Sequence, residues 1–467
     1  MIRLEETICA PATAVGGAIA IIRVSGSQTF NICDKIFFSL DTSIRLIDQK
    51  GFTIVFGDIR SGDSIIDEVL LSVFRAPHSY TGEHSVEISC HASPYIIRKI
   101  LELLILNGAV SANPGEFTQR AFLNGKIDLS QAEAVADIIA STTSSAHKVA
   151  INQMRGGFSE EIDRLRSDLL NFASLIELEL DFGEEDVEFV DRTELKSIII
   201  TVKELADRLV ISFLLGNVVK NGIPVAIVGK PNSGKSTLLN ALLMDEKAIV
   251  SEIPGTTRDT IEDTIVIDGI EYRFIDTAGL RETTDVIESM GIKKTHEKIE
   301  QAQVILLLDE ISDSAEAINK RAQAIREMTR ESEKRLFIII NKIDQALTGQ
   351  QQEISEKINL EEKDTLLFIS AKEKTGLDHL RVKLSEVIAK NKLSSDDVII
   401  TNIRHYEALI NVSESLDRVL SGLDHNVPED FIAIDIRQAI HYLGEITGEI
   451  TSDEILGNIF KNFCIGK

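Results

Sequence analysis

The sequence predicts an α/β and α multidomain protein in which an α/β domain with a mainly parallel sheet is inserted into a helical domain. The chain has 467 residues, and typical domain sizes then suggest about three domains. From residue 223 onward, short apolar runs alternate with helical segments, which is typical of a parallel sheet covered by helices. The stretches 119–216 and 390–467 on either side carry long amphipathic patterns, so we expect them to pack together as one helical unit.

The first part of the chain, residues 1–118, predicts a small α/β domain. Pro94 is expected to open a helix that ends before Gly108, because proline fits the first helical turn and glycine commonly follows the last. Short β-like runs around this helix occupy 18–24, 52–56, 69–74 and 86–89.

The helical unit is expected to contain two capping boxes. Ser130 with Glu133, and Thr451 with Glu454, have the spacing at which a hydroxyl and an acidic side chain satisfy the first free amides of a helix. Further helices are expected at about 195–215 and over a segment with the apolar face Ile162, Leu165, Leu169, Phe172 and Ile176.

Composition narrows the classes of function. Lysine and arginine number 49 and aspartate and glutamate 74, so the formal charge is −25, which argues against broad nonspecific attraction to nucleic acid or anionic lipid. No export signal or bilayer-spanning apolar run is visible, so we expect a cytoplasmic protein without membrane contact. The four cysteines form no closely spaced pair, which fits a reducing compartment: Cys9, Cys33, Cys90 and Cys464.

A phosphate-binding loop is the strongest local signal. Residues 229–236 read G-x-x-x-x-G-K-S directly after a strand-like run and before a helical pattern. Glycines in this context let backbone amides approach phosphate oxygens, Lys235 reaches the β and γ phosphates, and the Ser236 hydroxyl ligates Mg²⁺. The residues expected to contact the nucleotide here are Asn232, Ser233, Gly234, Lys235, Ser236 and Thr237.

Three further motifs follow in order, each at the carboxyl end of a strand-like run, where α/β sheets bind ligands. Asp276-Thr277-Ala278-Gly279 is expected to hold Mg²⁺ through water and to sense the γ phosphate. In Asn341-Lys342-Ile343-Asp344, the Asp344 carboxylate accepts two hydrogen bonds from guanine that adenine cannot supply. Ser370-Ala371-Lys372 adds a backbone donor for the guanine carbonyl. Together the motifs predict a P-loop GTPase domain of the Ras-like type over 217–389.

Two loops near the γ phosphate decide the expected mechanism. Thr257, in the loop 255–259, is expected to complete the Mg²⁺ shell. Small GTPases commonly place a water-orienting glutamine after the second motif, but this chain has Leu280 there, and an apolar side chain cannot orient water. The residues alone leave open which group takes over the role of the missing glutamine. The candidates are Arg281, Glu282 and Glu288, together with Asn232 as the ligand of a monovalent cation that replaces an arginine finger. It is equally open whether these residues are only solvated loop side chains.

Five sequence runs make the chain resemble a known family, the bacterial tRNA modification GTPases MnmE or TrmE, over essentially its full length. They are GKPNSGKSTLLNALL, GTTRDT, DTAGLRET, NPGEFTQRAFLNGKIDLSQAEA and the terminal FCIGK. The resemblance implies GTP as substrate, Mg²⁺ and K⁺ as ions, and a homodimer activated when its GTPase domains meet. It makes Glu288 the water-orienting catalytic group beside Lys235, and it implies the K⁺ ligands Asn232, Ser251, Ile253 and Thr256.

The resemblance also implies that residues 1–118 bind 5-formyl-tetrahydrofolate or a related folate and drive dimerisation. The matching positions are Arg23, Glu87, Lys126 and Lys467. Their types suit the ligand, because a carboxylate pairs with the donor-rich pterin edge while cations meet carboxylates or carbonyls. Cys464 has two interpretations, a small buried residue of the last helix or a catalytic group that faces the modification site.

The leading hypothesis from the sequence is a K⁺-dependent GTPase that modifies tRNA. With a flavin-dependent partner subunit it is expected to use a folate one-carbon unit to build a (carboxymethyl)aminomethyl group on carbon 5 of the wobble uridine, position 34, of certain tRNAs. One alternative is a ribosome-assembly regulatory GTPase without transfer chemistry, although the charge of −25 shows no basic RNA-binding domain. Another is a folate-dependent transferase in which GTP only switches conformation.

Overall fold

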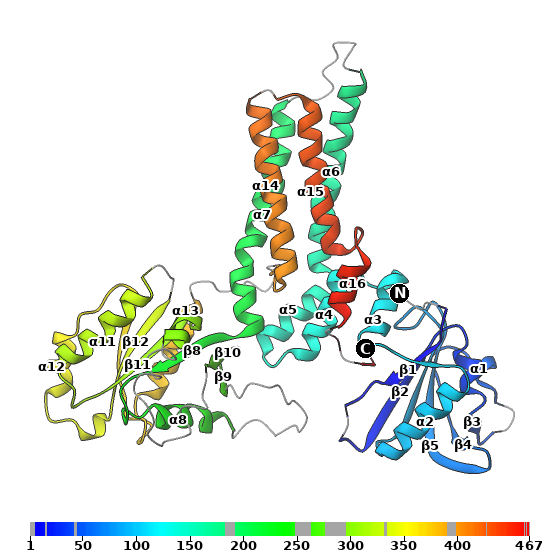
Figure 1. Ribbon diagram of the computed structural model, residues 1–467, viewed down its shortest axis with the longest axis horizontal. Coiled ribbons are helices and arrows are strands. Elements are labelled where there is room, and N and C mark those ends of the chain that lie inside the picture. The colour runs from blue at the N-terminus through cyan, green and yellow to red at the C-terminus, as the bar shows by residue number, and fades with distance from the viewer. Residues whose placement is uncertain are drawn as a thin grey trace.

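Three parts are visible in the computed structural model, two sheet-containing units and a tall helical bundle between them (Figure 1). The described residues are 5–14, 16–41, 44–182, 192–247, 263–275, 296–330, 334–389, 398–425, 427–461, 463 and 465–466. The α/β and α multidomain fold predicted from the sequence is confirmed, with a mainly parallel sheet in the inserted unit. The residue boundaries of the domains stay predictions. Among the described residues, no helix is both long and apolar enough to cross a membrane.

The N-terminal unit is a mostly antiparallel sheet of seven strands with two helices. Its strands are β1 (Ile8–Pro11), β2 (Ile19–Ser25), β3 (Phe37–Ser39), β4 (Thr53–Ser61), β5 (Ser64–Phe74), β6 (Ser85–His91) and β7 (Val110–Ser111), in the order β3-β4-β5-β6-β2-β1-β7. Helices α1 (Thr29–Cys33) and α2 (Pro94–Leu106) pack on one face of the sheet. Alternate residues of β5 fill that core, Val69, Leu71 and Val73, as the period of two in a strand requires.

Helices form the central unit. They are α3 (Glu116–Leu123), α4 (Leu129–Ala140), α5 (Ser144–Met154), α6 (Gly157–Phe182), α7 (Arg192–Asn221), α14 (Ile403–Asp424), α15 (Glu429–Thr447) and α16 (Asp453–Lys461). One core is shared by α6, α7, α14 and α15, so segments from both sides of the inserted unit pack together. The predicted apolar face of α6 is buried in this core, and α7 continues to Asn221, beyond the end expected near residue 215.

Both capping boxes predicted from the sequence are wrong. Helix α4 begins two residues earlier than Ser130 suggests: the Asp128 carboxylate accepts the Gln131 amide, and the Gln131 side chain accepts the Asp128 amide. At α16 the cap is the Ser452 hydroxyl, which accepts the Ile455 amide, rather than Thr451. Aspartate and serine are equally good N-caps, so the chain pattern alone did not separate the neighbouring choices.

The inserted unit contains a six-stranded sheet. Its strands are β8 (Ile223–Val228), β9 (Asp263–Ile267), β10 (Ile270–Phe274), β11 (Val304–Glu310), β12 (Arg335–Asn341) and β13 (Asp364–Phe368), in the order β13-β12-β11-β8-β10-β9. All neighbours are parallel except β9 and β10. The accompanying helices are α8 (Lys235–Lys247), α11 (Ala315–Met328), α12 (Gln350–Lys357) and α13 (Leu377–Ala389). Parallel strands bring the ends of β8, β11 and β12 to one edge.

Candidate functional site: a nucleotide site and a polar sheet face

The phosphate loop lies between the end of β8 and the start of α8, as the sequence predicts. Two of its glycines sit where no side chain fits. A Cβ on Gly229 would lie 2.2 Å from the Leu308 carbonyl oxygen, and a Cβ on Gly234 would lie 2.3 Å from Nδ2 of Asn341. Both residues have positive φ, +153° and +96°, which glycine adopts without strain. The loop backbone therefore passes close against Leu308 of β11 and against Asn341 at the end of β12.

Lys235 closes this loop from its own helix. Its Nζ donates to the carbonyl oxygens of Gly229, at 3.0 Å, and Lys230, at 2.8 Å. Burial, with a smaller contribution from the charge of Lys298, lowers the pKa of Lys235 below its ordinary value. Ser236 and Thr237 follow in the first turn of α8, while Asn232 is exposed with φ +65°. The site therefore holds a partly buried ammonium at the N-terminus of α8, which suits a phosphate chain.

Asn341 joins the phosphate loop to the guanine-side segments. Its side chain is buried; Nδ2 donates to the Ser233 carbonyl, at 2.8 Å, and Oδ1 accepts the Ala371 amide, at 3.0 Å. Nearby, the Ser370 hydroxyl donates to Oδ1 of Asp344, at 2.6 Å. That hydrogen bond is the main reason why the pKa of Asp344 lies below its ordinary value. An ionised Asp344 is the form that accepts hydrogen bonds from guanine.

Sequence reasoning missed a charged bridge beside the phosphate loop. Glu310 accepts Lys342 Nζ at 2.6 Å, and Lys230 Nζ lies 2.7 Å from Asp313 and 3.4 Å from Glu310. The hydrogen bond from Lys342 is the first cause that lowers the pKa of Glu310. The position of Glu310 at the carboxyl end of β11, next to the strand that carries the phosphate loop, was the signal available in the sequence. This bridge fixes Lys342, whose backbone has φ +63°.

Several predicted site residues lie outside the described residues, so their roles stay predictions. They are Ser251, Ile253, Thr256, Thr257, Asp276, Thr277, Ala278, Gly279, Glu288, Cys464 and Lys467. Lys372 is described and exposed, with Nζ 3.6 Å from Glu373.

The predicted cofactor residues Arg23 and Glu87 face each other across β2 and β6. Arg23 donates from Nε, at 2.9 Å, and places Nη2 2.8 Å from the same Glu87 oxygen. The rings of Tyr80 and Phe117 flank the Arg23 guanidinium, with centroids 5.2 Å and 5.6 Å away. This arrangement combines an acceptor, a cation and an aromatic surface, which are groups that a pterin can engage.

Lys126 reaches the same neighbourhood through the β5–β6 loop, residues 75–84. Its Nζ donates to the Pro77 carbonyl at 3.1 Å. The end of the chain also comes here, because a Cβ on Gly466 would lie 1.9 Å from the carbonyl oxygen of Pro11, the last residue of β1. The structure thus brings Arg23 and Glu87 together, places Lys126 against the same loop, and seats the tail on the N-terminal sheet.

Comparison with known proteins gives matches over nearly the whole chain. Residues 7–126 match the family model described as the GTP-binding protein TrmE N-terminus, and residues 129–464 match the MnmE helical domain. The tRNA modification GTPase MnmE of Bacteroides thetaiotaomicron is 52% identical over 465 residues, covering 99% of this chain and 100% of that protein. The chain belongs to the tRNA modification GTPase MnmE family. The MnmE of Flavobacterium psychrophilum is 53% identical, covering 99% of each chain.

Among solved structures, the chain is similar to the G domain of the FeoB iron transporter of T. maritima. The identity is 24%, and the match covers 35% of this chain and 97% of that one with a TM-score of 0.26. The family resemblance expected from the sequence is thereby confirmed by the MnmE relatives.

Proposed function

We propose that this chain hydrolyses GTP and uses that hydrolysis in tRNA modification. The observation that carries the proposal is the double hydrogen bond of Asn341, which ties the phosphate loop to the segment that would read guanine. These two hydrogen bonds connect the phosphate-binding part and the proposed guanine-binding part of a GTP site, which come from residues far apart in the chain. The proposal that the substrate is tRNA rests on membership of the MnmE family, since the chain is 52% identical to a tRNA modification GTPase over that protein's full length.

The proposed chemistry at the nucleotide is water attack on the γ phosphate with Mg²⁺ and K⁺ bound. Mg²⁺ would be held by Ser236 with Thr257, and it would neutralise developing phosphate charge. K⁺ would be held through Asn232 with Ser251, Ile253 and Thr256. Asn232 is exposed in the phosphate loop, and its amide oxygen is the proposed ion ligand. Lys235 places its charge at the loop, and Glu288 is proposed to orient the water.

A homodimer is the proposed working form, because the open face of the N-terminal sheet is apolar. Ile54 of β4 is 67% exposed, and the paired residues Phe56 and Leu70 are 44% and 46% exposed. A contiguous exposed patch of large apolar side chains commonly marks an interface. In the strand register, Ile54 lies in one row with Ser72, Glu87 and Arg23. A second copy on this face would therefore border the proposed cofactor residues.

A folate one-carbon donor is proposed to bind beside Arg23 and Glu87, with Lys126 and Lys467 at its edges. The Glu87 carboxylate is already turned toward a donor-rich partner, Arg23, so it would share or exchange that partner with a pterin. The folate would supply the carbon that is transferred to carbon 5 of the wobble uridine. A flavin-dependent partner subunit and Cys464 are proposed to take part in this transfer.

The test is GTP turnover by the purified full chain in K⁺ and in Na⁺. We expect faster turnover in K⁺, loss of turnover in Lys235→Ala, and reduced turnover with retained GTP affinity in Glu288→Ala. Equal rates in the two salts would remove the K⁺ proposal, while absence of turnover in both would contradict the GTPase. Co-purification with ribosomal subunits rather than with a flavoprotein would favour the ribosome-assembly alternative.

A further inference from the structure

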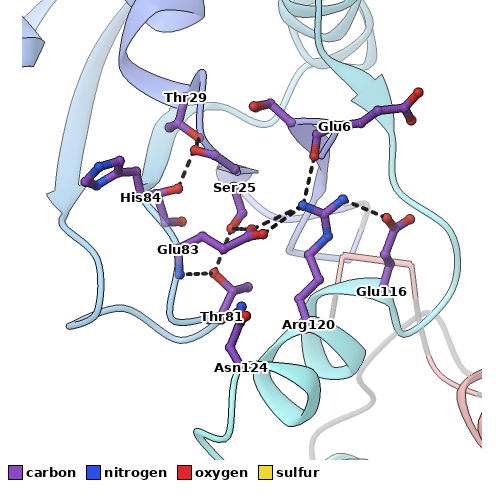
Figure 2. Close-up of polar contacts among 12 residues, drawn as sticks. Glu6, Ser25, Thr29, Thr81, Glu83, His84, Glu116, Arg120 and Asn124 are labelled. Carbon is purple, nitrogen blue, oxygen red and sulfur yellow. Dashed lines mark hydrogen bonds and ion pairs between the residues drawn. The ribbon is translucent and has the colours of Figure 1, made fainter. Parts of the chain in front are cut away.

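Arg120, on α3, is the largest side chain in the described residues that is fully buried. Its Nη1 donates to the Glu6 carbonyl at 2.8 Å and to both carboxylate oxygens of Glu83, at 3.1 and 3.2 Å. Its Nη2 donates to Glu116 at 3.0 Å. Figure 2 shows the guanidinium between these groups. A buried charge is tolerated only when it is paired and hydrogen-bonded, and here two carboxylates from different elements meet that need.

Glu83 extends the contacts of Arg120 into the β5–β6 loop. Its carboxylate also accepts the Ser25 hydroxyl, at 2.7 Å, and Ser25 is 2.7 Å from the Thr81 hydroxyl. The Asn124 amide donates to the Thr81 carbonyl at 2.7 Å. Figure 2 shows these residues converging on one side of the loop. The loop is therefore fixed to β2 through Ser25 and to the end of α3 through Asn124, and Arg120 neutralises the Glu83 carboxylate within it.

The same loop carries the groups that touch the proposed cofactor residues. Tyr80, 37% exposed, stacks its ring over the Arg23 guanidinium, and its hydroxyl lies 2.9 Å from that of the buried Thr118. Three residues earlier, the Pro77 carbonyl accepts Lys126 Nζ. A shift of the loop would therefore move the ring away from Arg23 and release Lys126 at the same time.

We propose that Arg120 is a positioning residue for the folate site: by holding Glu83 it fixes the β5–β6 loop, and the loop places Tyr80 against Arg23 and the Pro77 carbonyl against Lys126. Arg120 itself, buried, does not touch the ligand. This inference rests on the proposed folate function. It adds Tyr80 as a residue that borders the ligand and assigns a role to a buried ion cluster that the nucleotide chemistry does not use.

The experiment measures calorimetric binding of 5-formyl-tetrahydrofolate to the full chain. The variants are Arg120→Lys, Tyr80→Ala and the double variant. A lysine ammonium is a single point charge and cannot reproduce the guanidinium fork, which donates to the Glu6 carbonyl, Glu83 and Glu116 from two nitrogens, so we expect about tenfold or more weaker binding in Arg120→Lys. Because part of the effect of Arg120 passes through Tyr80, the double variant should lose less affinity than the sum of the two single losses, since changes that act through a shared contact are not additive.

Arg404→Lys is the matched control, because it replaces a second arginine that pairs with a buried carboxylate, Glu133, although Arg404 itself is only partly buried. Its thermal midpoint should fall by a similar amount while its folate affinity stays within about twofold of the original. GTP affinity should be unchanged in all of these variants. If Arg120→Lys does not fold, Thr118→Val, which removes only the partner of the Tyr80 hydroxyl, should still weaken folate binding by about threefold.

The outcomes separate the two proposals. Absence of folate binding by the unaltered chain would contradict the folate function itself. Normal binding by Arg120→Lys, fully additive losses in the double variant, or an equal loss in Arg404→Lys would overturn the positioning role while leaving the folate function intact. Unchanged binding in Thr118→Val would overturn the part of the proposal in which Tyr80 borders the ligand.

Discussion

Replacing Glu133 by glutamine should strongly destabilise the helical unit. Glu133 lies in α4 and is buried, and its carboxylate accepts Nε and Nη2 of Arg404, each at 3.0 Å, and lies 2.7 Å from Nε2 of His405. Burial alone would raise the pKa of Glu133, but His405 and Arg404 outweigh it and lower the pKa to about 2. Glutamine keeps the shape and removes the charge, which leaves Arg404 without its counter-ion.

The magnitude follows in two ways that agree. A pKa lowered from the ordinary 4.5 to about 2 corresponds to about 3 kcal/mol of stabilisation. Breaking a buried ion pair by removing one partner commonly costs about 3–5 kcal/mol. The lower end is expected here, because Arg404 keeps the carbonyl oxygens of Glu445 and Ile446 as acceptors. For a unit of this size, about 3 kcal/mol lowers the thermal midpoint by roughly 6–12 °C.

The pH dependence has a definite sign. The contribution of Glu133 is present above its unfolded pKa near 4.5 and is lost as pH falls toward the folded value of about 2. Burial, opposed by Glu133, lowers the pKa of His405 below its ordinary 6.5, so its contribution is present above 6.5 and is also lost toward acid. Glu133→Gln removes the charge that opposes this lowering of the His405 pKa, so the difference between the original chain and the variant should widen as pH falls below 6.5, and it should shrink below about 4.5, where Glu133 takes up its proton in the unfolded chain.

The assay is thermal unfolding followed by circular dichroism at several pH values. Glu102→Gln is the surface control, since its partners Arg98 and Lys99 and the residue itself are exposed or partly exposed, and such pairs contribute little. Glu133→Gln combined with Arg404→Met should recover much of the loss, because it removes the unpaired charge. A midpoint for Glu133→Gln within about 2 °C of the original would refute the reasoning.

Three further outcomes test the nucleotide site and the dimer. Asn341→Ala should weaken binding of a fluorescent GTP analogue by roughly 30-fold, since two buried hydrogen bonds are lost; Gln323→Ala, on the exposed side of α11, serves as control, and equal affinity would contradict the bridging role. Asp344→Asn should shift the preferred base from guanine to xanthine in nucleotide competition, because the amide donates where the carboxylate accepted; unchanged preference would count against the base assignment. Phe56→Glu should convert the dimer to monomer in light scattering, whereas Leu347→Glu, on an exposed loop, should not; a persistent dimer would remove the sheet face as the interface.

Much of the inserted unit could be predicted from the sequence. Strand β8 begins at residue 223, where the sequence analysis places the first apolar run of the parallel sheet, because buried parallel strands read as unbroken apolar runs. By contrast, β1, β3 and β7 have four, three and two residues, too few to show an alternating pattern. The antiparallel edge strand β9 was missed as well, since only part of it is buried.

In the candidate site, too, some features were predictable from the sequence and others were not. The motifs predicted the position of the phosphate loop between β8 and α8, since their spacing reflects local loop chemistry. Contacts between distant segments were not predictable, because spacing along the chain does not say which side chains meet across a fold. Glu133 was interpreted as a helix cap, yet it pairs with Arg404, 271 residues away. Arg120 stood within a family-specific run without a role until its buried partners were visible.

The most direct test of the proposed function is nucleoside analysis of tRNA from a bacterial strain that lacks this protein. We predict that wobble uridines lose the carbon 5 modification, that the full chain restores it, and that Lys235→Ala does not. Wobble uridines that stay modified in the deletion strain, or full restoration by Lys235→Ala, would contradict the conclusion that GTP hydrolysis by this chain drives tRNA modification.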